Sequence, residues 1–171
     1  MHYFGYGSNM LLARLKRRVP SAERVANATL TGYGLRFHKR SRDGSGKCNI
    51  IPNDGETVHG VVFDVSCADL DALDEAEQQG RRYQRQPVTV QTETSAVDAF
   101  AYVAEPFYVD DSLMPYEWYH ALVLAGAHEH SLPPPYIEQI EAVPTCPDPD
   151  RKRRRRHKQL LDDAGHPLLA P

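Results

Sequence analysis

The β-rich stretch between residues 25 and 65 constrains the fold of this 171-residue chain more than any other feature. Residues 25–37 alternate loosely between apolar and polar and include Gly32 and Gly34, which predicts a strand with a bend or a bulge. A polar, glycine-containing loop or hairpin connection follows at residues 39–47. Two short strands and the turn between them complete the stretch, at residues 48–52, 57–65 and 53–55.

Helices and further strands flank this stretch. Ser66 offers a helix N-cap, and Asp69 adds a favourable negative charge to the first turn of a helix predicted over residues 68–78. The other predicted strands are residues 2–4, 83–91 and 97–104, and the other predicted helices are residues 10–17, 116–127 and 136–142. The pattern therefore predicts a β-rich chain that also contains several helices.

The length and composition of the chain are sufficient for one hydrophobic core. With 41% hydrophobic residues, we expect one domain over residues 1–145 and a basic, partly helical tail over residues 146–171. No apolar run is long enough to span a bilayer, and the N-terminus has no signal-peptide pattern. Three scattered cysteines show no paired metal spacing and suit a reducing cytosol. We therefore expect a cytoplasmic protein that does not associate with membranes.

The positive charge of the chain is concentrated near its C-terminus. Residues 151–158 hold 7 of the 20 Lys and Arg residues and no acid, so the rest of the chain carries 13 − 23 = −10. Such a cluster can bind nucleic acid, acidic lipid headgroups or an acidic face of another subunit. Because no aromatic residues alternate with the arginines, a solvated, partly helical tail is the favoured interpretation. Nucleic acid is therefore not an expected partner.

The residues Tyr6-Gly7-Ser8-Asn9 form a sharp turn between the first predicted strand and helix. Glycine lets the backbone approach a ligand, and free N–H groups at a helix start suit a carboxylate or an oxyanion. An ordinary turn with Ser8 or Asn9 as N-cap explains the same pattern. A nucleophilic serine requires Gly-x-Ser-x-Gly, but Met10 occupies the second glycine position. The glycine spacings also fail the dinucleotide-binding and P-loop motifs.

Glu77 is the acid that helical phase places on the apolar stripe of the 68–78 helix, together with Leu70 and Leu73. A carboxyl drawn into an apolar pocket has a raised pKa, which suits it to accept and return a proton near neutral pH. An earlier end of the helix, or an acid neutralised by a nearby arginine, fits the pattern equally well, and the candidate arginines are Arg81, Arg82 and Arg85.

Several short motifs occur in one order along residues 2–143. They are Tyr6-Gly7-Ser8-Asn9-Met10, Gly60-Val61-Val62-Phe63, Leu73-Asp74-Glu75-Ala76-Glu77, Tyr83, Gly126-Ala127-His128-Glu129, Leu132-Pro133 and Tyr136. In this order they resemble the γ-glutamylcyclotransferase family, small enzymes that release 5-oxoproline from γ-glutamyl amides. A single tetrapeptide would be a weak signal, but the ordered set is specific.

The resemblance implies a fold and a set of site residues. The implied fold is α+β, a small mixed β-barrel with surrounding helices. The resemblance also implies that the Tyr6-Gly7-Ser8-Asn9 loop holds the glutamyl end of the substrate and that Glu77 is the catalytic acid–base residue. Tyrosines line the site in this family, and the matching positions are Tyr83, Tyr102 and Tyr119. The chain departs from the family at Gln78, where glycine often follows the catalytic glutamate.

The implied activity needs no cofactor and no metal, and the partner is a small-molecule γ-glutamyl substrate. His128 and His130, the histidine pair nearest to a ligand spacing, are interpreted as a surface helix end. Asn9 resembles the branch that acts on γ-glutamyl amino acids, but activity on glutathione, on γ-glutamyl-lysine or in an antibiotic pathway stays open. A non-catalytic binding adaptor that uses the basic tail also stays open, as does a homodimer.

Overall fold

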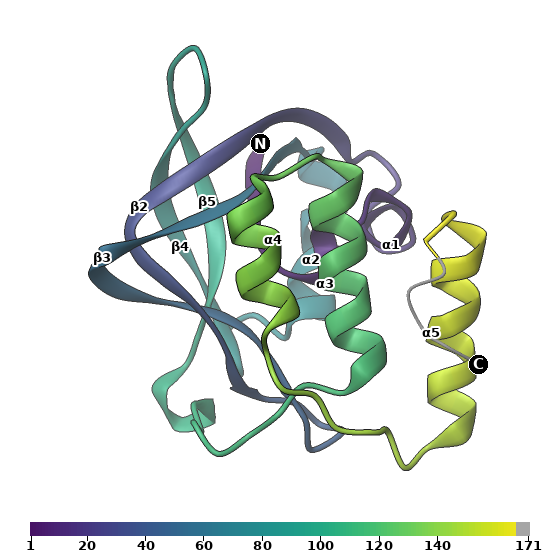
Figure 1. Ribbon diagram of the computed structural model, residues 1–171. Helices are drawn as coiled ribbons and strands as arrows, with labels where there is room; N and C mark the ends of the chain where they lie inside the picture. The colour runs from purple at the N-terminus through teal and green to yellow at the C-terminus, as the bar shows by residue number, and fades with distance from the viewer. Residues whose placement is uncertain (167–171) are drawn as a thin grey trace.

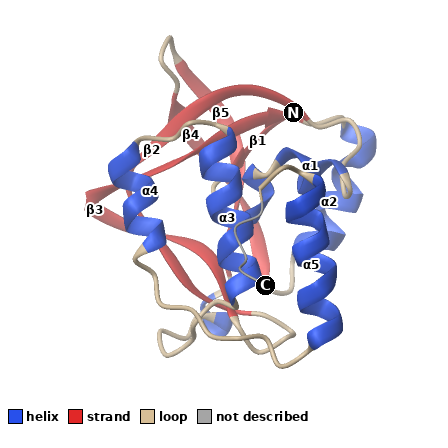
Figure 2. Ribbon diagram, turned by 45° about the vertical axis from the view of Figure 1, so that its right-hand side comes forward, coloured by secondary structure: helices blue, strands red, loops and turns tan. Residues whose placement is uncertain are grey.

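In the computed structural model, which describes residues 1–166, five strands form a closed barrel with helices packed against it (Figure 1 and Figure 2). The order around the barrel is β1-β3-β2-β4-β5, and β1 and β5 pair in parallel while the other neighbours are antiparallel. The strands are β1 (His2–Gly5), β2 (Glu23–Arg40), β3 (Gly46–Asp64), β4 (Tyr83–Gln91) and β5 (Ala96–Ala104). The expected α+β barrel is confirmed.

Strands β2 and β3 form one long antiparallel hairpin that curves along the barrel, with a connecting loop at residues 41–45 (Figure 1). The predicted turn at residues 53–55 is wrong, because these residues lie inside β3, in a bulge where residues 53–56 stand opposite Gly32. Gly32 has a φ of 80°, a left-handed conformation that glycine adopts without steric cost. The additional residues of β3 therefore form a bulge, and both strands continue beyond it.

Helices and short 3₁₀ turns connect and cover the strands. The N-cap prediction is confirmed, because Ser66 Oγ accepts a hydrogen bond from the Asp69 N–H at 3.3 Å. None of the helices within residues 1–166 has the length and apolar character needed to cross a membrane. The elements are η1 (Ser8–Met10), α1 (Leu12–Lys16), η2 (Cys67–Asp69), α2 (Leu70–Glu77), η3 (Pro106–Tyr108), α3 (Glu117–Glu129), α4 (Pro134–Glu141) and α5 (Arg151–Asp163).

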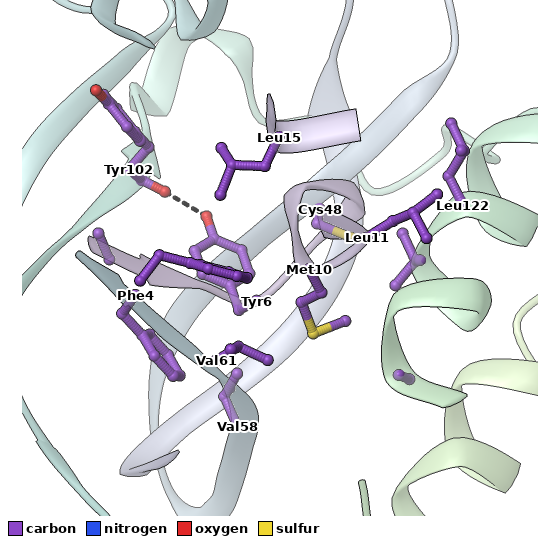
Figure 3. Packing of buried hydrophobic residues seen from close by; sticks show 14 of the residues in the cluster. Phe4, Tyr6, Met10, Leu11, Leu15, Cys48, Val58, Val61, Tyr102 and Leu122 are labelled. Carbon is purple, nitrogen blue, oxygen red and sulfur yellow. Dashed lines mark hydrogen bonds between the residues drawn. The ribbon is translucent and has the colours of Figure 1, made fainter. Parts of the chain in front are cut away.

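The contact between α3 and η1 positions the N-terminal loop against the barrel. A Cβ at Gly126 would lie 2.6 Å from the Leu11 nitrogen and 2.6 Å from Met10 Cβ, so the close approach requires glycine. Met10 and Leu11 are fully buried at this contact (Figure 3). His130, which follows α3, is expected on the surface from the sequence, but it is buried, and its Nε2–H donates to the Met10 carbonyl at 2.9 Å.

The basic run forms the first half of α5, which lies beside α3 (Figure 1). Leu160 and Leu161 of this helix are buried. The His157 ring stacks on Trp118 of α3, with ring centroids 3.8 Å apart and an interplanar angle of 9°. Apolar and aromatic contacts therefore fix one face of the basic helix against the rest of the protein.

Candidate active site

The loop after β1 is shaped by close packing against β3. A Cβ at Gly7 would lie 3.0 Å from Cys48 Cβ and 3.4 Å from the Tyr119 hydroxyl, which leaves little room for a side chain there. Ser8 and Asn9 lie within η1, and neither caps a helix through its side chain. The alternative of an ordinary N-capped turn is therefore excluded, since both side chains bond to other elements instead.

Glu77 is the last residue of α2, and two side chains from the N-terminal region hold one of its oxygens. Glu77 Oε1 accepts a hydrogen bond from Arg18 Nη1 at 2.6 Å and from Asn9 Nδ2 at 3.0 Å. Glu77 Oε2 takes part in no hydrogen bond within residues 1–166. The Glu77 side chain is 17% exposed, and Leu73, one turn earlier, is fully buried. The carboxylate thus has one fixed oxygen and one that is free to meet a substrate.

The arginine that binds Glu77 is not one of the three expected from the sequence. Arg18 lies 59 residues earlier in the chain, whereas nearby Arg85 approaches Asp74 at 3.5 Å. Arg18 Nη1 also donates to Asn9 Oδ1 at 3.1 Å, so the arginine, the amide and the carboxylate form one network. No local sequence pattern could have identified this partner, because the barrel alone brings residues 18 and 77 together.

Four tyrosines present their hydroxyl groups to backbone and side-chain partners around the site. Tyr6 donates to the Tyr102 carbonyl (Figure 3), and Tyr102 donates to Asp74 Oδ1 at 2.6 Å. Tyr83 donates to the Cys48 carbonyl at 2.7 Å, and the Tyr119 hydroxyl accepts from the Cys48 N–H at 3.0 Å. Burial raises the pKa of each of these tyrosines, so all four stay protonated near neutral pH.

All eight residues that the sequence suggested for the site line a single small cavity of about 30 Å³. Tyr3 and Cys48 also line it, and sequence reasoning missed both. The Tyr3 hydroxyl accepts a hydrogen bond from Asn9 Nδ2 at 3.0 Å. Nothing in the sequence separates Tyr3 from an ordinary buried strand residue. The eight cavity residues that were predicted from the sequence are Tyr6, Gly7, Ser8, Asn9, Glu77, Tyr83, Tyr102 and Tyr119.

The arrangement combines a positioned carboxylate with a shell of neutral hydroxyl groups. A carboxylate whose free oxygen reaches a substrate can accept a proton and return it. The Cys48 thiol is a poor nucleophile here, because burial raises its pKa to about 12. Within residues 1–166, no group of three or more His, Cys, Asp and Glu side chains is arranged to hold a metal ion.

A comparison with models of known protein families finds a match that covers most of the chain and includes most of the motifs. Residues 3–121 match the family model described as gamma-glutamyl cyclotransferase, AIG2-like. This segment runs from β1 into α3, and it includes the loop at residues 6–9 and Glu77. The matched segment thus contains every residue that lines the small cavity.

Curated relatives and a solved structure extend the match over most of the chain. A human protein named gamma-glutamylcyclotransferase is 31% identical over 148 residues, which cover 82% of this chain and 77% of the human protein. The mouse protein of the same name is 30% identical over 150 residues, with the same coverage. A solved structure titled gamma-glutamyl cyclotransferase has a TM-score of 0.83 and 26% identity, and the match covers 93% of this chain and 98% of that one.

Proposed function

Since the chain belongs to the γ-glutamylcyclotransferase family of enzymes, we propose that it cyclises γ-glutamyl amino acids or amines to 5-oxoproline and releases the free amine. The observation that supports this best is the position of Glu77. It lies in the same small cavity as the Tyr6–Asn9 loop, with one carboxylate oxygen held and the other free. An intramolecular cyclisation needs a group that accepts and returns protons, and the free carboxylate oxygen of Glu77 is the candidate for this role.

The reaction joins two atoms of the same substrate. The α-amino nitrogen of the γ-glutamyl group attacks its γ-carbonyl carbon, a new C–N bond closes the five-membered lactam, and the original amide C–N bond breaks. The α-amino group is mostly ammonium at neutral pH and cannot attack until it loses a proton. Because attack is intramolecular, a site that folds the substrate into the reactive bend contributes much of the rate.

Glu77 would carry the proton through both halves of the reaction. Its free Oε2 takes the proton from the α-ammonium group and later delivers it to the departing amine nitrogen. Arg18 and Asn9 hold Oε1, so the carboxylate keeps its orientation during the transfer. The α-nitrogen begins with three protons and ends as the lactam N–H with one, so two protons leave it. Glu77 passes the first to the amide nitrogen as its bond to carbon breaks, and the second, released as the lactam forms, converts the free amine to its ammonium form. The reaction therefore balances without another reactant.

The residues around Glu77 would bind and fold the γ-glutamyl group. Backbone N–H groups of Gly7, Ser8 and Asn9 are the candidates to hold the α-carboxylate or the developing oxyanion. Tyr83, Tyr102 and Tyr119 would enclose the glutamyl chain, since their rings line the same cavity. The cavity of about 30 Å³ is near the size of one water molecule, so a whole substrate also requires neighbouring space.

A direct test is 5-oxoproline release from γ-glutamyl-alanine, glutathione and γ-glutamyl-lysine, measured for the wild type and for Glu77→Gln. We expect release by the wild type and a loss of at least about 100-fold in kcat for the variant, because the amide cannot accept the proton. The amide oxygen can still accept from Arg18 and Asn9, so the thermal unfolding midpoint should change little.

Glu75→Gln is the matched control, because Glu75 is exposed on the same helix and lines no part of the small cavity. We expect it to keep the wild-type kcat. Release that persists in Glu77→Gln would remove the acid–base role of Glu77. A folded wild type that releases no 5-oxoproline from any of the three substrates would contradict the proposed function.

A further inference from the structure

A second cavity of about 300 Å³ opens beside the small one, and Glu77 stands where the two meet. Ser8, Glu77, Tyr83 and Tyr119 line both cavities, so a molecule bound at Glu77 can extend from one into the other. In the proposed reaction the leaving amine receives its proton at Glu77. The larger cavity is therefore the space that the leaving group would occupy.

The wall of this cavity is strongly positive. Its two acids are Asp43 and Glu77, and its six cations are Arg14, Arg18, Lys39, Lys47, Arg153 and Arg156. Three cations have acidic partners: Arg18 binds Glu77, Lys47 binds Asp43, and Arg153 binds Asp148. The other three, Arg14, Lys39 and Arg156, form no ion pair within the described part of the chain.

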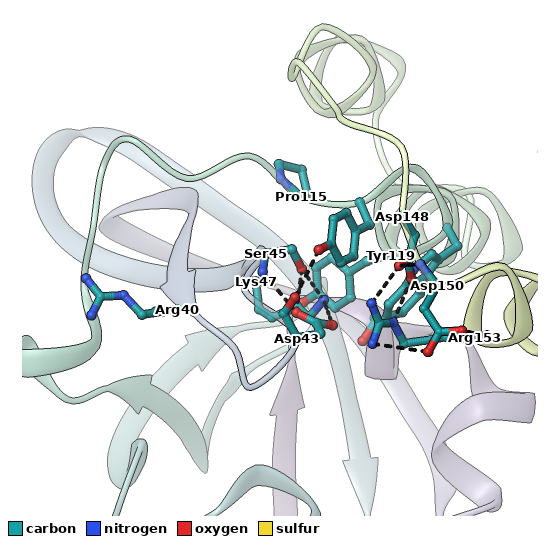
Figure 4. Close-up of polar contacts among 12 residues, drawn as sticks. Arg40, Asp43, Ser45, Lys47, Pro115, Tyr119, Asp148, Asp150 and Arg153 are labelled. Atoms are coloured by element: carbon teal, nitrogen blue, oxygen red, sulfur yellow. Dashed lines mark hydrogen bonds and ion pairs between the residues drawn. The ribbon is translucent and has the colours of Figure 1, made fainter.

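The two lysines occupy directly opposed positions of the β2–β3 hairpin, where like charges repel. Lys39 is 4% exposed and Lys47 is 9% exposed. Lys47 contacts Asp43 at 2.9 Å (Figure 4), but the Lys39 ammonium forms no ion pair and no hydrogen bond within residues 1–166 and lies 4.3 Å from the centroid of the Tyr83 ring. Burial lowers the pKa of Lys39 to about 8, and the charge of Glu77 across the cavity offsets only part of this effect. A buried ammonium group that no anion contacts directly is costly, which points to a ligand that supplies one.

Helix α5 completes the positive wall. Arg153, Arg156 and His157 line the cavity from this helix, and Arg153 is anchored by two bonds of 2.6 Å to Asp148 (Figure 4). Burial and the neighbouring Arg14 lower the pKa of His157 to about 3, so this ring is neutral and the arginines carry the charge. The basic run of the sequence is thus partly directed into the cavity beside Glu77.

We propose that the leaving amine of this protein's γ-glutamyl substrate carries two or more negative charges, which Arg14, Lys39 and Arg156 bind in the larger cavity. This inference rests on the proposed function, and it narrows the substrate class to γ-glutamyl conjugates of an acidic amino acid or of a phosphorylated amine. Carboxylate and phosphate oxygens both match ammonium and guanidinium donors.

The test compares γ-glutamyl-glutamate, γ-glutamyl-phosphoethanolamine and the uncharged leaving group of γ-glutamyl-ethylamide. We expect a kcat/KM at least about 10-fold higher for one charged substrate than for the ethylamide, and the better charged substrate identifies the source of the anion. Arg156→Gln and Lys39→Gln should each reduce this ratio several-fold. Arg155→Gln, a neighbouring exposed arginine that does not line the cavity, should leave the ratio unchanged.

Binding measured without turnover separates this inference from the proposed function. Trp118 is the single tryptophan of the chain and lines the cavity, so its fluorescence reports occupancy. We expect Glu77→Gln to bind the better charged substrate at least about 10-fold more tightly than the ethylamide. Equal affinities and equal kcat/KM values would overturn the inference, and would mean that the cations bind the α-carboxylate common to all three substrates. Absence of turnover in the wild type would contradict the proposed function alone.

Discussion

At the scale of one residue, Lys39 is a charged side chain whose burial lowers the stability of the folded protein near neutral pH. Its ammonium group is buried in the barrel wall opposite Lys47, and burial lowers its pKa from 10.5 to about 8. In the unfolded chain the lysine keeps its usual pKa. The folded protein therefore binds fewer protons than the unfolded chain between pH 8 and pH 10.5, and the contribution of Lys39 to stability rises over that window.

We predict that Lys39→Met stabilises the protein at pH 7 and that the gain shrinks as the pH approaches 10. Below pH 8 the wild type carries the full cost of a buried charge, on the order of 3 kcal/mol, and the variant does not. Urea unfolding of both proteins at pH 7 and at pH 10 measures the difference. Lys16→Met, at an exposed lysine, is the control and should show no such pH dependence. A variant less stable than the wild type at pH 7 would contradict the prediction.

At the scale of the element, the end of helix α2 determines where the candidate catalytic carboxylate lies. Gln78 follows Glu77 with a φ of 57°, and its N–H bonds back to Glu75 and Asp74. The Gln79 N–H donates to the Asp74 carbonyl at 2.8 Å, which closes the helix in a Schellman-type turn. Such a turn favours glycine, and Gln78 adopts it at a steric cost while its buried Oε1 has no hydrogen-bond partner within residues 1–166.

We predict that Gln78→Gly raises the free energy of unfolding by about 1 kcal/mol, because glycine adopts the left-handed conformation without the Cβ clash. Urea denaturation measures the change. Gln79→Gly is the matched control, since Gln79 has no positive φ and should lose several tenths of a kcal/mol through added flexibility in the unfolded chain. A loss of stability in Gln78→Gly would contradict the prediction. It would show that the contacts of the Gln78 side chain stabilise the protein by more than its left-handed backbone conformation destabilises it.

At the scale of the whole molecule, α5 joins the C-terminal segment to the barrel and the site. The boundary expected at residue 145 is a prediction that unfolding can test, because Leu160 and Leu161 of α5 are buried. A tail independent of the domain would tolerate truncation of these side chains. A helix that packs as part of the domain would not.

We predict that Leu161→Ala lowers the free energy of unfolding by about 2 to 4 kcal/mol, because it leaves a cavity in a packed contact. Gln159→Ala, at an exposed position of the same helix, should change it by less than about 0.5 kcal/mol. Urea unfolding followed by Trp118 fluorescence reports both, since Trp118 stacks on His157 of α5. Equal stability of the two variants would indicate that residues 146–171 form a separate tail.

The sequence by itself determined the α+β barrel, most of its strands and the position of Glu77 at the end of α2. These follow from local periodicity and from motifs in one order, so they need no knowledge of distant contacts. The turn predicted at residues 53–55 failed because a turn and a bulge share the same local signal, and pairing opposite Gly32 decides between them.

Only the tertiary structure decided the partners of Glu77 and the charge beside it. Arg18 reaches Glu77 across 59 residues, and Lys39 and Arg156 line one cavity although they are far apart in sequence. The sequence alone favours a solvated tail for residues 151–158, because no aromatic residues alternate with the arginines, and it does not show that part of this run faces the cavity. The physical reason is that barrel closure and the packing of α3 and α5 set these distances, and neither is encoded in any local pattern.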